Sequence, residues 1–120
     1  MTNEKKGMTK GSFYIVVEDK KHRYDKNYAK VERVHGYVFT DDESGLQFGC
    51  DKRDNSWAVT ELSTGLLVSN FGEAKVKNDA YAVVDKKRKA VVKVIKSKDK
   101  EWAKNLINEA LSIGKDEVSG

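Results

Sequence analysis

The sequence predicts an α+β domain, in which an antiparallel meander sheet of about five strands carries two C-terminal helices packed on one face. Between residues 12 and 69, short runs of β-branched and aromatic residues alternate with polar, turn-forming clusters. This pattern is typical of hairpins, since parallel strands need long crossover connections. After residue 78 the apolar spacing changes from two to three and four, which indicates helices. The 120 residues suffice for one domain, expected over 12–114 between mobile tails at 1–11 and 115–120.

The first expected strand covers 12–18, where aromatic and β-branched residues form a run too short for a helix. A polar loop over 19–30 separates it from the remaining apolar runs. We expect those strands at 34–40, 46–50, 57–62 and 66–69, with turns at 41–45, 51–56 and 63–65. Gly45 and Gly65 stand in two of these turns, where we expect backbone angles that are closed to most other residues.

The first helix is expected over 78–95, with Asn78 or Asp79 as its N-cap, because apolar residues recur there at spacings of three, four and seven. The many valines favour an alternative, since β-branched residues are mediocre helix formers. In that alternative, two strands at 80–84 and 90–95 are joined by a basic turn.

The second helix is predicted to be capped by Asp99 and to end at Gly114. Its apolar stripe consists of Trp102, Leu106, Ile107, Ala110 and Leu111. Together with the apolar faces of the strands, the helices give an expected core. Its members are Phe13, Ile15, Val17, Phe48, Trp57, Val59, Leu62, Leu66, Val83, Val91, Ile95, Trp102 and Leu106. Cys50 is in phase with Phe48, so we expect it to be a small buried apolar residue.

The residue content excludes several kinds of site. One cysteine and two histidines cannot supply a disulfide or a cysteine-rich zinc site, and no phosphate-binding glycine loop or nucleophile motif is present. The carboxylates of 41–43 are better explained as turn residues than as magnesium ligands. Glu61 is expected either to face inward, with a pKa raised by burial, or to pair with Lys52 across the strands. We therefore expect no enzyme, no cofactor and no metal site.

The sequence also carries two expectations about location. No apolar run reaches the roughly 18 residues of a membrane-spanning helix, and no apolar segment of secretory length follows the basic N-terminal residues. We therefore expect a cytoplasmic protein without a membrane partner.

The basic segment 86–100 carries the strongest functional signal. It holds eight positive residues against one negative residue, a net +7, whereas the whole chain carries +4, so the remaining residues sum to −3. In a helix, Lys87 falls inside the apolar stripe and must extend its ammonium group outward. Five other lysines form a stripe opposite the valines: Lys86, Lys89, Lys93, Lys96 and Lys100.

This segment has three interpretations: a solvated outer face, a contact surface for phosphates of DNA or RNA, or a contact surface for an acidic protein. The candidate contact residues are Lys86, Arg88, Lys89, Lys93, Lys96 and Lys100. A secondary contact is predicted in the loop over 19–30, where cations alternate with tyrosines that either stack on bases or pack against the sheet edge. Its residues are Lys20, Arg23, Tyr24 and Tyr28.

The segment 57–66, WAVTELSTGL, resembles one in small, largely uncharacterised proteins of phages and other mobile elements in Gram-positive bacteria. There, a strand that begins with tryptophan meets a similar turn, and a lysine-rich helix follows later in the chain. The resemblance implies an accessory protein that acts by binding host or phage machinery, and it carries over no catalytic residue. The expected function is therefore a non-catalytic interaction module for a macromolecular partner, with direct nucleic-acid binding as the alternative.

Overall fold

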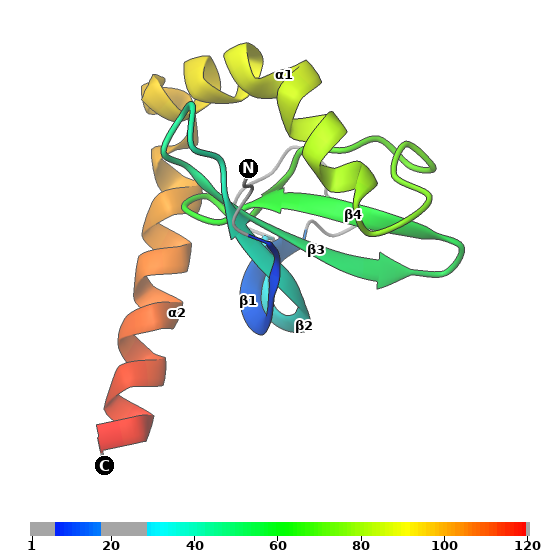
Figure 1. Cartoon of the computed structure of the whole chain (residues 1–120). Coiled ribbons are helices and arrows are strands. Elements are labelled where there is room, and N and C mark those ends of the chain that lie inside the picture. The colour runs from blue at the N-terminus through cyan, green and yellow to red at the C-terminus, as the bar shows by residue number, and fades with distance from the viewer. Residues whose placement is uncertain (1–6, 18–28, 120) are drawn as a thin grey trace.

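The computed structural model describes residues 7–17 and 29–119, with side chains as far as residue 113. Within them, five antiparallel strands form one sheet in sequential order. The strands are β1 (Thr9–Val17), β2 (Lys30–Thr40), β3 (Gln47–Arg53), β4 (Ser56–Glu61) and β5 (Leu66–Leu67). They are followed by α1 (Asp79–Lys96), the short 3-10 helix η3 (Lys98–Lys100) and α2 (Glu101–Ser119). The expected α+β meander with two C-terminal helices is confirmed (Figure 1).

Residues 79–96 form a helix, so the alternative of two strands in this segment is wrong. The helix buries Ala80, Val83 and Val84 against a cluster on the sheet that includes Phe48 and Val59. This packing offsets the modest helix propensity of valine, because most helical stability in proteins comes from an apolar face that is covered.

The sheet curls into a half-barrel. The two neighbours of β2 pair with different lengths of it. β1 pairs with β2 along its whole length, whereas β3 pairs only with the stretch from Tyr37 to Thr40. Gly36 lies at this boundary, where an added Cβ atom would come within 2.1 Å of the Cys50 carbonyl oxygen. At the open side, the Val16 amide donates to the Gly65 carbonyl over 2.8 Å and brings β1 back to the turn before β5.

Some expected boundaries are corrected by the hydrogen-bonding pattern. The turn expected over 51–56 is only two residues long, because β3 continues to Arg53 and β4 begins at Ser56. Asp54 makes the tight turn possible by adopting a positive φ of 52°, a conformation that Asp and Asn tolerate better than most residues. β1 begins at Thr9, inside the expected tail, and β2 begins at Lys30, before the expected strand. Gly45 and Gly65 take the expected positive φ angles, 74° and 67°.

The start and the end of the second helix also differ from expectation. Asp99 is not its cap, because α2 begins at Glu101. The Ser97 hydroxyl instead accepts a hydrogen bond from the Asp99 amide and caps η3. The helix does not end at Gly114 but continues to Ser119. A single glycine lowers helix propensity by about 1 kcal/mol without ending a helix when helix formers flank it and no proline follows.

The core confirms part of the expected set. Phe13, Ile15, Phe48, Val59 and Val83 are buried. The other members are half-buried: Val17, Trp57, Leu62, Leu66, Val91, Ile95, Trp102 and Leu106. Cys50 is fully buried, as expected. On α2 the buried side chains are Ala103 and Ile107; Ile107 belongs to the expected stripe, whereas Ala103 does not. Phe39, Ala74, Ala80 and Val84 also belong to the core.

Candidate functional site

The packing of α1 determines which of its cations face solvent. Its apolar face lies against the sheet through Val83 and Val84. At 100° per residue, four lysines point to the opposite side, and all of them are exposed. We call them the lysine face: Lys86, Lys89, Lys93 and Lys96. They span about 15 Å along the helix at about 1.5 Å per residue.

Arg88 does not belong to the lysine face, because three carboxylates of this chain surround it. Its Nε and Nη2 atoms each donate to the Asp41 carboxylate over 2.8 Å, and it also pairs with Glu43 and Asp85. Its side chain is only 19% exposed. Arg88 lowers the pKa of Asp41 to about 2, although burial opposes this change, and Ser44 contributes two further hydrogen bonds. The charge of Arg88 therefore joins the β2–β3 turn to α1.

Lys87 extends out of the apolar face, as expected from the sequence. Its Nζ atom donates to the Val68 carbonyl over 2.9 Å and to the Glu73 carboxylate over 2.7 Å. This bond, together with one from the Asn70 amide, lowers the pKa of Glu73. Lys86 lies 3.7 Å from the same carboxylate, but its side chain remains 75% exposed. Lys87 therefore ties the loop after β5 to α1, while Lys86 stays available on the surface.

Lys100 does not continue the lysine face, contrary to the expected stripe. Helix α1 ends at Lys96, and Ser97 takes an extended conformation before η3 begins. Lys100 is half-buried and lines a cavity instead. Four of the six predicted contact residues thus lie together, whereas Arg88 and Lys100 lie elsewhere. The predicted secondary contacts Lys20, Arg23, Tyr24 and Tyr28 lie outside the described residues.

The two carboxylates of α1 both make local contacts. The acidic residues of α1 are Asp79 and Asp85. Asp79 accepts the backbone amides of Lys75 and Val76, and Asp85 pairs with Arg88. Lys93 and Lys96 lie in the last helical turn, where the helix dipole favours cations. The result is a row of positive charges on a helix fixed to the sheet.

The carboxylate of Glu61 is buried, but it serves the turn that follows β4. It accepts hydrogen bonds from the amide and hydroxyl groups of both Ser63 and Thr64, over 2.8–3.0 Å. The expected pairing with Lys52 is wrong, because Lys52 lies opposite Trp57 and Glu61 lies opposite Phe48. With four donors on its two oxygens, Glu61 stabilises the turn.

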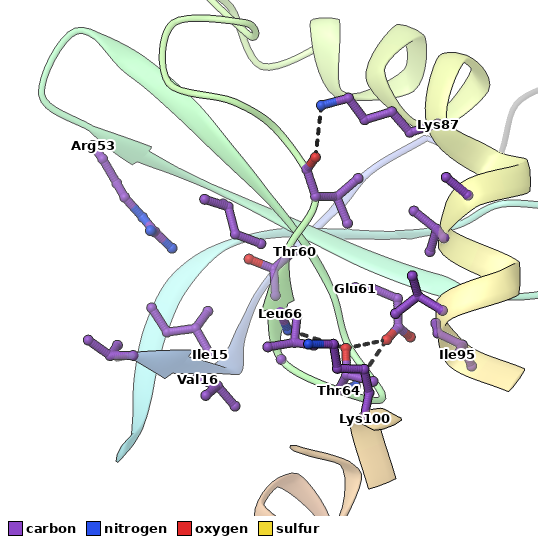
Figure 2. Close-up of a pocket in the computed structure, with 17 residues that line it drawn as sticks. Ile15, Val16, Arg53, Thr60, Glu61, Thr64, Leu66, Lys87, Ile95 and Lys100 are labelled. Carbon is purple, nitrogen blue, oxygen red and sulfur yellow. Dashed lines mark hydrogen bonds between the residues drawn. The ribbon is translucent and has the colours of Figure 1, made fainter. Parts of the chain in front are cut away.

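A cavity of about 770 Å³ lies between β1, the β4–β5 hairpin and the second half of α1 (Figure 2). Aliphatic side chains line most of it, including Ile15, Leu67 and Val94. Sequence reasoning missed this cavity, because its walls meet only when the sheet curls. Two buried hydroxyls line it, those of Thr60 and Thr64, and the Thr64 hydroxyl donates to Glu61.

Asp51 and Cys50 are two further titratable residues that are buried. Asp51 accepts two hydrogen bonds from Arg53, over 2.9 and 3.1 Å. Burial, followed by the nearby charge of Asp51, raises the pKa of the Cys50 thiol to about 11. Across residues 7–17 and 29–119, no group of three or more His, Cys, Asp or Glu side chains is placed to hold a metal ion.

Two further findings concern membrane-spanning helices and relatives. Over the same described ranges, no helix is long and apolar enough to cross a membrane. The chain matches no protein-family model, no curated protein and no solved structure. The resemblance of 57–66 to proteins of phages and mobile elements therefore stays a prediction. In the structure this segment is β4, its following turn and the first residue of β5.

Proposed function

We propose that this chain is a non-catalytic interaction module of the phage or mobile-element type, which acts in the cytoplasm and binds a macromolecule with an acidic surface through the lysine face. The observation that carries the proposal is the division of the cations of α1. Lys87 and Arg88 are neutralised by carboxylates of the chain, whereas the lysine face is exposed along one side of the helix.

The fixed position of α1 supports a binding role. Its valines pack on the sheet, the Arg88–Asp41 pair holds it to the β2–β3 turn, and the Lys87–Glu73 pair holds it to the loop after β5. A partner therefore meets lysines in a defined row. Since an exposed ion pair contributes only about 0.2–1 kcal/mol, several contacts must form at once, and the partner must present a matching row of negative groups.

Direct nucleic-acid binding is the second candidate, favoured by the length of the row. One DNA strand presents a phosphate about every 3.4 Å, so a row of about 15 Å passes roughly four phosphates. Neutralising four phosphates gives a slope of about −3.6 for log affinity against log salt. Affinity should then fall about 10²-fold between 50 and 200 mM salt.

A pull-down from host lysate, with and without nuclease, tests both candidates. The informative variant is Lys89→Glu, Lys93→Glu and Lys96→Glu combined. The matched control is Lys10→Glu, Lys52→Glu and Lys75→Glu, which alters three exposed lysines outside α1 and changes the net charge equally. Wild type and control should retain a partner that the lysine-face variant loses.

The nuclease arm separates the partner classes. Retention after nuclease treatment supports an acidic protein, whereas loss of the partner, together with gel retardation of DNA or RNA that weakens steeply with salt, supports nucleic acid. Equal binding by the wild type and the lysine-face variant would overturn the proposal, and so would equal losses in the lysine-face variant and the control.

A further inference from the structure

The cavity between the half-barrel and α1 has the features of a ligand site that is independent of the lysine face. Its volume of about 770 Å³ lies within the range of small-molecule pockets, roughly 300–1,000 Å³. Two of the large apolar side chains exposed on the surface, Leu67 at 56% and Val94 at 40%, lie on its wall. These side chains would lose contact with water if the cavity were filled.

The lining points to an aliphatic ligand. The wall is formed by branched side chains from three elements, including Ile15 of β1, Leu67 of β5 and Val91, Val94 and Ile95 of α1. No aromatic ring is among the described lining residues, so the cavity offers no face on which a planar base or ring could stack. A flexible hydrocarbon chain fits such a surface.

One polar atom inside the cavity lacks a partner. Among the side chains that the structure describes, Thr60 Oγ1 is the one buried oxygen or nitrogen without a hydrogen bond. A buried hydroxyl without a partner is unfavourable, and such groups are few in folded proteins. Figure 2 shows the Thr60 hydroxyl directed to the side of β4 where the Arg53 side chain lies, and the Glu61 carboxylate directed away from it.

Arg53 supplies a cation to the lining of the cavity. It lies at the surface end of the cavity with its side chain 40% exposed, and its two bonds to Asp51 use two of its five N–H donors. Lys100 and Lys87 add two further positive charges to the lining, and Glu61 adds a carboxylate that the turn after β4 already engages. The cavity therefore combines an aliphatic wall with a hydroxyl donor and cations, which is complementary to an apolar chain that ends in an anion.

We propose that this cavity binds a free straight-chain aliphatic carboxylate, whose head group accepts hydrogen bonds from Thr60 and Arg53 and whose chain lies against the aliphatic wall formed by β1, β5 and α1. The proposal does not depend on the function of the lysine face. A water molecule bonded to Thr60 is the alternative occupant, and it requires neither the chain nor the cation.

The test titrates the full chain with monomeric saturated fatty acids of increasing length by calorimetry. Affinity should rise about fourfold per added methylene until the cavity is filled, because each buried methylene contributes about the same transfer free energy. The methyl ester of the best ligand should bind at least about tenfold more weakly, since it removes the charged acceptor. A planar aromatic carboxylate should bind more weakly than the aliphatic acid.

Three variants locate the ligand. Thr60→Val keeps the side-chain shape and removes the donor, and Arg53→Met removes the cation; each should weaken binding about tenfold. Ala90→Phe places a ring from an exposed lining position into the cavity and should abolish binding. Lys93→Glu, on the lysine face, is the matched control and should bind as the wild type does. The midpoint of thermal unfolding of ligand-free Thr60→Val should not fall, which checks that this variant folds.

Several results would overturn the proposal. These are no binding up to the solubility limit of the acids, affinity independent of chain length, or binding that all three cavity variants leave unchanged. Binding to phosphatidylglycerol vesicles without binding to the monomeric acid would also overturn it, because the occupant would then be a membrane surface.

Discussion

The ion pair between Asp41 and Arg88 is the contact of α1 whose contribution to stability can be worked out from the structure. Two parallel hydrogen bonds of 2.8 Å join side chains that are 47 residues apart in the chain. The side chains are 9% and 19% exposed. Asp41→Asn keeps the size of the side chain and removes its charge, so it tests the pair without opening a cavity.

The expected magnitude follows from the pKa of Asp41. The gap between its ordinary value of 3.8 and about 2 in the folded chain corresponds to about 2 kcal/mol at neutral pH. Water reaches the outer side of the cluster, where Glu43 and Asp85 are largely exposed, and screens part of this energy. We therefore expect Asp41→Asn to lower the free energy of unfolding by about 1–2 kcal/mol at pH 7.

The pH dependence has a definite sign. The pKa of Asp41 is lower in the folded chain than in the unfolded chain, so its contribution is fully present above pH 4 and is lost as the pH falls toward 2. Wild type should therefore lose its advantage over Asp41→Asn within this window. Urea unfolding of both proteins from pH 7 down to pH 2 measures the change.

A double-mutant cycle assigns the energy to the pair. Arg88→Met and Asp41→Asn should cost less together than the sum of their separate effects, by about 1 kcal/mol or more. Asp85→Asn is the matched control, because Asp85 also contacts Arg88 but is 66% exposed, and it should cost less than about 0.5 kcal/mol. Additive single effects, or an advantage of wild type that persists unchanged at pH 2, would show that the Asp41–Arg88 pair does not stabilise the fold.

Two further predictions concern the sheet. Gly36→Ala should destabilise the chain by about 2–3 kcal/mol in urea unfolding, because its Cβ would lie 2.1 Å from a backbone oxygen. Gly11→Ala is the control on the paired position of β1, where the nearest atom is 4.0 Å away; equal costs would contradict the close approach. The Cys50 thiol, buried and with its pKa raised to about 11, should react with thiol reagents at pH 8 only as fast as the chain opens, as measured against the unfolded protein. Rapid labelling of the folded chain would contradict this burial.

Most of the fold is predictable because its signals are local. Alternating apolar residues and the polar turn-forming clusters between them predict the strands between residues 31 and 67. The recurrence of apolar residues at spacings of three and four predicts α1. The curl of the sheet has no local signal. It depends on Gly36 meeting the Cys50 carbonyl and on Gly49 meeting the ring of Phe13, where an added Cβ would lie 2.7 Å from ring carbons. A glycine in a strand pattern indicates a close approach, but the partner is known only from the three-dimensional structure.

The cavity depends on the same curl. In the sequence, Thr60 is one β-branched residue in a strand, which is where threonine is common. Its hydroxyl becomes a buried donor without a partner only when β1 bends back toward β5. No spacing in the sequence brings Ile15 of β1, Leu67 of β5 and Val94 of α1 to one wall.

The sequence also does not show which cations of α1 are paired within the chain and which are exposed. Four consecutive cations, from Lys86 to Lys89, carry equal charge in the sequence but act differently in the structure. Lys87 and Arg88 bind carboxylates that are 14 and 47 residues away, whereas Lys86 and Lys89 are exposed. Neutralising the four together would release α1 from the sheet contacts and remove surface charge in the same protein. A loss of binding in such a variant would therefore not identify the binding surface. Only substitutions confined to the lysine face separate the charge that holds α1 in place from the charge that α1 presents to a partner.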